Sequence, residues 1–326
     1  MHEHDPWHRG PMDVLVLSPV HETALATLER EHRVRRVLEP RQEELAGLVT
    51  DCEVLILRSG VVVDAGVLQR AERLRLIVRA GSGTDNLDVE AAAARGVQIV
   101  TIPAPGAKAV AEMAFALMLT LARNVLPADR ALREGRWLKH ELTGRSLGGK
   151  TLGVLGAGSI GGRVGRLGVA WGMTVLGTVE TPSPVVVRCL EQQGIEAVSQ
   201  DELLRRSDYV SVHVPLTART RGLLDADALA LMKPGAYLVN LARGGVVDEQ
   251  ALHDALVEGR LAGAALDVHA AEGEGRISPL ADLPNVVLTP HLGAGTWEAQ
   301  EEIGASVLAA VHDHQAVRLA GPKQSA

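Results

Sequence analysis

The feature that most constrains this chain is a glycine loop between a short apolar run and a helical pattern. Residues 156–161 read Gly-Ala-Gly-Ser-Ile-Gly and fit the pattern G-x-G-x-x-G. The loop follows the apolar run 151–155 and opens a helical stretch that ends near Trp171, which is the context that gives the motif meaning. In such a loop Gly156 permits a tight turn, Gly158 lets backbone approach a pyrophosphate, and Gly161 lets the helix pack on the strand.

The start of this helix is expected to hold the phosphates of a dinucleotide. A helix N-terminus offers free N–H groups and the positive end of its dipole, so Ser159 and Ile160 join the three glycines as candidate cofactor contacts. The acid that binds the adenosine ribose usually ends the next strand, and Glu180 is the only acid in the right place. A carboxylate there would repel a 2′-phosphate, and the next arginine is Arg188, so the sequence favours NAD over NADP.

Two series of short apolar runs alternate with helical patterns, which predicts an α/β fold with parallel sheets covered by helices. A length of 326 residues favours two domains. A long apolar helix is expected from about Ala107 to Val125, stopped by Pro127 and buried because it is hydrophobic nearly all round. A last helix is expected from Thr296 to about His314. The expected strands are 14–17, 54–57, 76–78 and 97–100 in the first series, and 151–155, 174–176, 209–214, 237–240, 264–268 and 286–289 in the second.

Composition points to a small-molecule partner. A net charge of −7 gives no electrostatic reason to bind nucleic acid or an anionic membrane, and four Trp, two Tyr and one Phe leave little to stack on bases. Cys52 and Cys189 cannot make a disulfide framework or a multi-thiolate metal site, so no metal is expected. Residues 1–12 are expected to be a disordered tail without a secretory signal, and no apolar run is long enough to span a bilayer, so a cytoplasmic location is expected.

Three segments place reactive side chains just past apolar strands, where α/β enzymes bind their ligands. An arginine, Arg243, follows the strand 237–240, and its forked guanidinium matches a carboxylate. Glu272 lies five residues after Asp267, and His291 follows the strand 286–289. A histidine is the natural acid/base near neutral pH, and a carboxylate beside it would orient its ring. Singly, these residues are equally consistent with an ion pair, a solvated loop acid and a turn histidine; together, behind a nucleotide loop, they favour an active site.

These motifs together resemble the D-isomer-specific 2-hydroxyacid dehydrogenase family, most closely its D-3-phosphoglycerate dehydrogenase-like branch. The resemblance spans about Val54 to Ala294. The matching segments are Arg79–Asn86, Gly156–Gly161, His213–Thr217, Asn240–Gly245, Ala265–Val268 and Pro290–Ala294.

The resemblance implies roles for these residues. Arg243 would hold the substrate carboxylate and carbonyl, His291 would protonate the carbonyl oxygen as hydride arrives, and Glu272 would pair with His291. The implied substrate contacts are the backbone of Gly81, Ser82 and Gly83, with Arg58, Ser59 and Gly60 on the far side. The implied cofactor contacts are Asp267 near the nicotinamide, and His213, Val214, Pro215, Thr220, Leu241, Ala242, Gly293 and Ala294 along the cleft.

The resemblance also implies two doubly wound Rossmann-like domains and a homodimer built on the cofactor domains. Residues 13–106 and 293–326 would form a discontinuous substrate domain, and residues 107–292 an inserted NAD-binding domain. Because the chain ends near residue 326, the C-terminal regulatory domains of long phosphoglycerate dehydrogenases are expected to be absent.

The implied reaction is hydride transfer between NAD(H) and a D-2-hydroxy/2-oxo acid, with 3-phosphoglycerate or a related phosphorylated or phosphonylated acid preferred. A hydroxypyruvate or glyoxylate reductase is the alternative within the family, and an NAD-sensing scaffold or corepressor is the alternative of another class. Formate oxidation is disfavoured because Glu272 stands where that branch has an amide. Phosphite oxidation is disfavoured because Ser82 stands where that branch has a lysine.

The chain departs from the family pattern at several positions. Val179 occupies the usual place of the ribose acid, Gly273 that of a proline, and Gly106 that of an asparagine. His269 replaces a common phenylalanine and is interpreted as a peripheral histidine. A second cation for a substrate phosphate could come from Lys139, His140 or Arg145, which fit a solvated surface run equally well.

Overall fold

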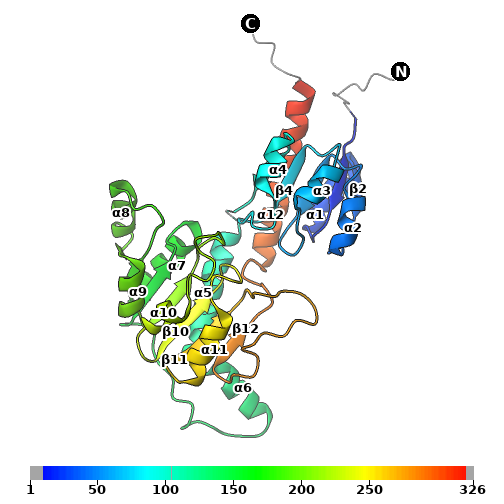
Figure 1. The fold of residues 1–326 in the computed structure, drawn as a ribbon. Coiled ribbons are helices and arrows are strands. Elements are labelled where there is room, and N and C mark those ends of the chain that lie inside the picture. The colour runs from blue at the N-terminus through cyan, green and yellow to red at the C-terminus, as the bar shows by residue number, and fades with distance from the viewer. Residues whose placement is uncertain (1–9, 104, 321–326) are drawn as a thin grey trace, which may run out of the picture. The chain divides into compact units, whose positions relative to one another are not determined.

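The computed structural model describes residues 10–103 and 105–320, and the chain divides into two compact units (Figure 1). Unit 1 takes the described residues up to Gly106 and from Gly295 onward, and unit 2 is Ala107–Ala294. The expected second boundary lay between residues 292 and 293, two residues earlier. Each unit contains one all-parallel sheet covered by helices, so the predicted α/β fold with two Rossmann-like domains is confirmed.

Unit 1 is built on a five-stranded sheet. Its strands are β1 (Asp13–Val16), β2 (Arg33–Arg36), β3 (Val54–Leu57), β4 (Leu76–Arg79) and β5 (Gln98–Thr101), in the order β2-β1-β3-β4-β5. Its helices are α1 (Glu22–Glu31), α2 (Gln42–Leu48), α3 (Ala65–Arg70), α4 (Val89–Ala94) and α12 (Trp297–Ala320).

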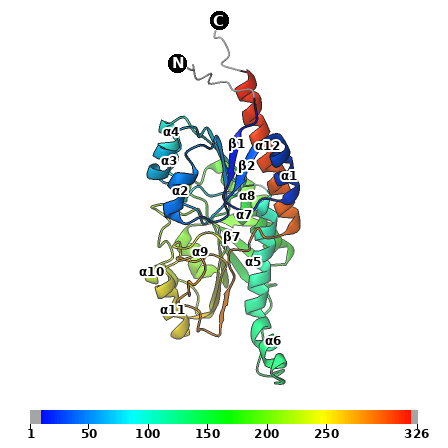
Figure 2. The ribbon, with the colours of Figure 1, turned by 90° about the vertical axis from the view of Figure 1, so that its right-hand side faces the viewer.

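Side chains along each strand of unit 1 point alternately to the two faces of the sheet, and different helices cover the two faces. Val14 and Val16 pack with residues of α1 and α12, whereas Leu15 and Leu55 pack with α2, α3 and α4. Helix α12 lies beside α1 (Figure 2), although most of the chain separates them. The last helix therefore completes the core of unit 1, as expected from the sequence.

Unit 2 is built on a seven-stranded sheet. Its strands are β6 (Thr151–Leu155), β7 (Thr174–Gly177), β8 (Ile195–Ala197), β9 (Tyr209–Val212), β10 (Ala236–Asn240), β11 (Leu261–Leu266) and β12 (Val286–Leu288), in the order β12-β11-β10-β9-β6-β7-β8. Its helices are α5 (Gly106–Ala122), α6 (Val125–Arg133), α7 (Ser159–Ala170), α8 (Pro184–Glu191), α9 (Gln200–Arg206), α10 (Ala226–Ala230) and α11 (Glu249–Val257). The core of one face includes residues of α5, α7 and α8, and that of the other face includes residues of α9, α10 and α11.

The long apolar helix ends in a different way from the one expected. Helix α5 stops at Ala122, Asn124 adopts a left-handed conformation with φ +53°, and α6 then begins at Val125. Pro127 does not stop a helix: it lies in the first turn of α6, where a backbone N–H has no intrahelical partner to lose. Within residues 10–103 and 105–320 no single helix is long and apolar enough to cross a membrane, and α5 and α6 reach that length and composition only as a pair bent by 61°.

The structure contains two short strands that the sequence did not predict, and the expected N-terminal tail ends earlier than expected. The strands β2 and β8 were not expected, because β2 reads Arg-Val-Arg-Arg and β8 has only three residues. The expected tail reached residue 12, but Met12 is fully buried and its carbonyl accepts a hydrogen bond from the Arg33 N–H. Residues 1–9 of that tail lie outside the described residues.

The glycine loop generates a stability test with a matched control. A Cβ at Gly161 would collide with the Gly156 carbonyl oxygen, whereas the nearest atom to a Cβ at Gly162 is 3.8 Å away. We expect Gly161→Ala to lower the free energy of unfolding by about 1–3 kcal/mol through overpacking. Gly162→Ala should be neutral or stabilising by up to about 1 kcal/mol, because alanine favours the helix. Thermal unfolding followed by circular dichroism measures both; equal midpoints for the two variants would contradict the packing argument.

Candidate active site

The three predicted reactive segments leave one edge of the sheet of unit 2. Asn240 at the end of β10 pairs in register with Leu266 at the end of β11, and Leu266 pairs with Leu288 at the end of β12. The strands are parallel, so their carboxyl ends lie side by side and the loops that follow them meet. Arg243, Glu272 and His291 belong to these three loops.

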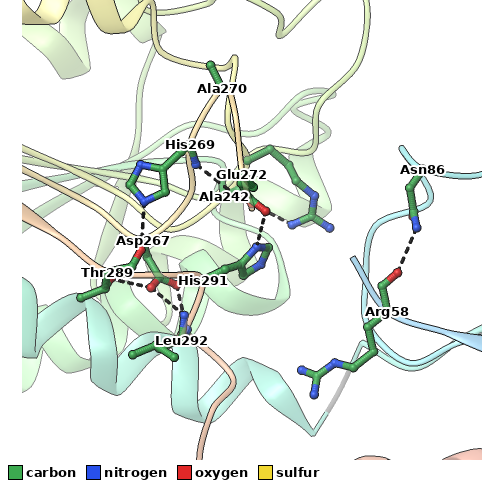
Figure 3. A network of polar contacts seen from close by, with 12 residues as sticks. Arg58, Asn86, Ala242, Asp267, His269, Ala270, Glu272, Thr289, His291 and Leu292 are labelled. Carbon is green, nitrogen blue, oxygen red and sulfur yellow. Dashed lines mark hydrogen bonds and ion pairs between the residues drawn. The ribbon is translucent and has the colours of Figure 1, made fainter. Parts of the chain in front are cut away.

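A buried carboxylate organises the loop that carries the histidine. Asp267 is 1% exposed and directly follows β11. Its carboxylate accepts hydrogen bonds from the Thr289 hydroxyl at 2.6 Å and from the backbone N–H groups of Leu292 and Gly293, each at 2.7 Å (Figure 3). Three donors on one carboxylate compensate its burial and fix residues 289–293 as a tight turn.

His291 sits at the apex of this turn in a backbone conformation that histidine rarely adopts. Its φ is +55°, in the left-handed region, which costs a side-chain-bearing residue of order 1–3 kcal/mol. The conformation is held by hydrogen bonds from the His291 N–H to the carbonyls of Asp267 at 2.8 Å and Thr289 at 3.0 Å. Backbone strain of this kind is common at active sites, which agrees with the role expected for His291.

Glu272 meets the ring of His291, as the resemblance implied. Its Oε2 lies 3.2 Å from His291 Nδ1, and the two side chains are 35% and 32% exposed. Burial raises the pKa of Glu272, but the hydrogen bond and charge of His291, together with the backbone N–H of His269, outweigh it and hold that pKa below its usual value. An ionised carboxylate therefore orients the imidazole ring of His291.

The loop after β10 is closed by its own amide groups. Asn240 Oδ1 accepts the Ala242 N–H at 3.0 Å, and Asn240 Nδ2 donates to the Arg243 carbonyl at 3.1 Å. Arg243 Nη1 donates to the Ala242 carbonyl at 2.7 Å. Gly244 then passes so close to the carbonyl of His269 that no Cβ fits between them, so the arginine loop packs directly on the segment that leads to Glu272.

The glycine loop has the geometry that a pyrophosphate site needs. Gly156 has φ +95° and lies against the backbone of His213, where a Cβ would collide. Beside Gly158 nothing lies within 4 Å of a Cβ position, so its backbone is open to a ligand. Helix α7 begins at Ser159 with no side-chain cap, and its first N–H groups are available to phosphate oxygens. These residues fit a dinucleotide.

The polar side chains of His213 and Thr220, in the loop after β9, form hydrogen bonds within the protein. His213 Nε2 shares a 2.8 Å hydrogen bond with the Ser211 hydroxyl, and burial lowers the pKa of His213 to about 3, so the ring is neutral. The Thr220 hydroxyl, expected to face the cofactor, closes its own loop by donating to the Pro215 carbonyl at 2.5 Å and accepting the Thr217 N–H at 2.8 Å. Among the other expected cofactor contacts, Leu241 and Ala242 are 6% and 7% exposed, and Ala294 packs on the core.

The expected ribose acid has a partner that the sequence did not reveal. Val179, at the position of the usual acid, packs on the core, while the neighbouring Glu180 is exposed and forms an ion pair with Arg219 from the loop after β9. The negative charge of Glu180 is therefore paired with the positive charge of Arg219.

Unit 1 brings the expected substrate residues together at the carboxyl ends of β3 and β4. Arg58, Ser59 and Gly60 follow β3, and Gly81, Ser82 and Gly83 follow β4. Asn86 links the two loops: its Nδ2 donates to the carbonyls of Arg58 at 2.9 Å and Val61 at 2.7 Å, and its Oδ1 accepts Arg79 Nε at 3.2 Å (Figure 3). Arg58 Nη1 donates to Gln300 Oε1 at 2.6 Å, and burial lowers the pKa of Arg58.

Arg145, one candidate for a second substrate cation, lies beside the start of β10, whereas Arg243 follows the end of that strand. It donates to the Gly235 carbonyl at 3.3 Å and its guanidinium stands 5.9 Å from the centre of the Tyr237 ring, at the start of β10. Lys139 and His140 lie on an exposed segment of the same unit.

Comparison with known proteins identifies the family. Residues 115–293, more than half of the chain, match the model of the D-isomer specific 2-hydroxyacid dehydrogenase, NAD binding domain. The chain belongs to the D-isomer specific 2-hydroxyacid dehydrogenase family. It therefore carries an NAD-binding domain in unit 2, and the sequence resemblance is confirmed.

Relatives within the family carry several activities in their names. The chain is 42% identical over 296 residues to a D-3-phosphoglycerate dehydrogenase of Methanocaldococcus jannaschii, covering 90% of this chain and 56% of that protein. It is 40% identical over 274 residues to a hydroxypyruvate reductase of Thermotoga maritima, covering 82% and 86%. A D-lactate dehydrogenase of Aquifex aeolicus complexed with NAD and lactic acid superimposes with a TM-score of 0.84 at 28% identity, covering 95% and 98%. The chain spans little more than half the length of the curated phosphoglycerate dehydrogenases it matches.

Several residues that position this family site were missed in the sequence. Asn240 and Thr289 are polar residues at expected strand ends, and that position is a signal that could have singled them out. Asn86 lies seven residues past β4 and carries no such signal. Glu249 at the start of α11 accepts the Ala270 N–H at 2.6 Å and so anchors the loop of Glu272. It carries no local signal, because its partner lies 21 residues away.

The Asp267 turn generates a prediction that separates charge from size. In Asp267→Asn the amide nitrogen replaces one acceptor oxygen, so the part-buried backbone N–H of Leu292 or the buried one of Gly293 loses its partner. We expect a loss of about 1–3 kcal/mol in the free energy of unfolding, measured by chemical denaturation. Asp282→Asn, at an exposed position, is the matched control and should change nothing. Equal unfolding midpoints for the two variants would show that the turn does not depend on the carboxylate.

Proposed function

We propose that this protein transfers a hydride between NAD(H) and a D-2-hydroxy/2-oxo acid. The observation that carries the proposal is the contact between Glu272 and His291, which stands on the Asp267 turn. The arginine loop packs on the segment that leads to Glu272. This arrangement supplies a proton donor, an anion that stabilises its charged form, and a cation for a carboxylate.

In the proposed reaction each residue has a distinct role that follows from its chemistry. Nicotinamide supplies or accepts the hydride when bound. In the reductive direction Arg243 binds the substrate carboxylate through its forked N–H groups. His291 Nδ1 faces Glu272, so Nε2 is the nitrogen that donates a proton to the carbonyl oxygen. Glu272 stabilises the charged ring before transfer, and in the oxidative direction His291 takes the proton from the substrate hydroxyl.

We propose that unit 1 also contributes substrate contacts. The backbone of Gly81, Ser82 and Gly83 would bind the carboxylate, and Arg58 would line the site. The support is the Asn86 amide, which fixes the two loops against each other, and the half-buried guanidinium of Arg58.

The preferred substrate is 3-phosphoglycerate or a related phosphorylated or phosphonylated acid. The support is the 42% identity to a protein named D-3-phosphoglycerate dehydrogenase. Hydroxypyruvate is the second candidate, because the relative named hydroxypyruvate reductase is matched over 86% of its length.

We also propose a cytoplasmic homodimer that binds neither nucleic acid nor membrane. The net charge of −7 argues against polyanionic partners. The dimer is supported by apolar side chains left exposed on and after α6, with Leu132 at 61% and Trp137 at 76%. Analytical ultracentrifugation would give the mass of one chain if the dimer is wrong, and cell fractionation tests the location.

Turnover tests the proposed reaction. NADH oxidation should be measured with a panel of 2-oxo acids that includes 3-phosphohydroxypyruvate and hydroxypyruvate. Arg243→Ala and His291→Ala should each lower kcat/KM by at least about a hundredfold, because each removes a group used in the reaction. NADH binding, followed by fluorescence, should remain. Arg205→Ala on α9 and His253→Ala on α11 are matched controls outside the site. A protein that binds NADH but reduces no acid would favour a sensor or corepressor instead.

The ion pair of Glu180 generates a prediction on cofactor choice. If Glu180 binds the ribose hydroxyls, Glu180→Ala should reduce the preference for NADH over NADPH by about tenfold or more, since a hydrogen bond to a charged group is lost. Arg219→Ala removes the cation beside Glu180 and should strengthen the preference. The ratio of kcat/KM for the two cofactors measures both. An unchanged ratio in Glu180→Ala would place cofactor discrimination elsewhere.

A further inference from the structure

His269 occupies a central place among the reactive loops of unit 2. It lies two residues after Asp267 and three before Glu272, and its side chain is directed toward the turn of His291 (Figure 3). We propose that His269 is a positioning residue that locks the His291–Glu272 pair in its working geometry. The proposal rests on the proposed function and names a residue outside the set that reacts.

The side chain of His269 reaches the strained turn. Its Nε2 lies 2.9 Å from the Thr289 carbonyl oxygen. A carbonyl only accepts hydrogen bonds, so Nε2 carries the proton. The same oxygen accepts the His291 N–H at 3.0 Å. The carbonyl that helps to hold His291 in its left-handed conformation is therefore itself held by His269.

The backbone of His269 reaches the other member of the pair. Its N–H donates to Glu272 Oε1 at 3.2 Å, while Glu272 Oε2 faces His291. A single residue thus contacts the turn of the proton donor through its ring and the carboxylate through its backbone. The backbone of Gly244 packs against the carbonyl of His269, which also ties the arginine loop to this point.

The environment of His269 Nδ1 is energetically unfavourable for an imidazole ring. His269 Nδ1 is buried, and within residues 10–103 and 105–320 it has no hydrogen-bond partner. Burying an unpaired acceptor is unfavourable, and a phenyl ring would fill the same space without that cost. What the imidazole supplies and a phenyl ring lacks is the N–H that binds Thr289.

Two variants separate the hydrogen bond from the packing. His269→Phe keeps an aromatic ring but removes the N–H, and His269→Gln keeps an N–H donor without the ring. His253→Phe, on the surface of α11, is the matched control. Steady-state kinetics with the best 2-oxo acid gives kcat and KM, fluorescence gives the dissociation constant of NADH, and thermal unfolding reports the fold.

We expect His269→Phe to lower kcat by about five- to tenfold, the worth of one hydrogen bond, with KM and NADH binding unchanged. His269→Gln should recover most of kcat. Wild-type kcat in His269→Phe would overturn the proposal. So would a loss of kcat that His269→Gln does not restore and that follows the unfolding midpoint, because that pattern marks a packing role.

A measurement without turnover keeps this test independent of the proposed reaction. The ¹⁵N chemical shifts of the His291 ring, assigned with His291→Gln, report its hydrogen bond to Glu272. They should move in His269→Phe and return toward wild type in His269→Gln. If the wild-type protein reduces no acid, the proposed function fails while the shifts still decide the role of His269; unchanged shifts in His269→Phe would overturn it.

Discussion

The candidate site depends on one buried carboxylate. Asp267 is almost fully enclosed, and an ion in that position is tolerated only when its oxygens are well supplied with donors. Thr289, Leu292 and Gly293 provide those donors, all from one turn. The carboxylate and the turn therefore stabilise each other, and the geometry of His291 at the apex follows from their contact.

Parallel strand pairing turns this local contact into a site. The ends of β10, β11 and β12 are adjacent although about fifty residues separate Asn240 from Leu288 in the chain, so an arginine, a glutamate and a histidine from three loops can meet. Adjacent strand ends alone do not bring the three side chains together, because a long loop can adopt many conformations. Here the loops are tied by short-range polar contacts: the Asn240 amide closes the first, Glu249 anchors the second, and Asp267 fixes the third.

The contrast between β3 and β2 shows how far the sequence predicts the fold. Strand β3 is buried on both faces and reads as four apolar residues, so its bounds were predicted correctly. Strand β2 lies at a sheet edge, and its arginines look like a loop because their partners, such as Asp13 for Arg33, are distant in sequence. The placement of Arg243, Glu272 and His291 at one edge of the sheet was predictable, because each belongs to a loop that follows a strand. The ion pair of Glu180 with Arg219 and the φ of His291 were not, since both depend on tertiary contacts.

The strained backbone of His291 needs support from several neighbouring residues. A left-handed histidine would relax if its turn were loose, and the relaxed ring would leave Glu272. The backbone N–H of His291 donates to the carbonyls of Asp267 and Thr289. The Asp267 carbonyl directly follows β11, and the Thr289 carbonyl also contacts His269 Nε2. Glu272 needs similar support, because the glycines that follow it, Gly273 and Gly275, have positive φ and restrain the loop little. The geometry of the His291–Glu272 pair is therefore a property of the loops on both sides of it, and under the proposed reaction substitutions that never touch substrate should change the rate of proton transfer.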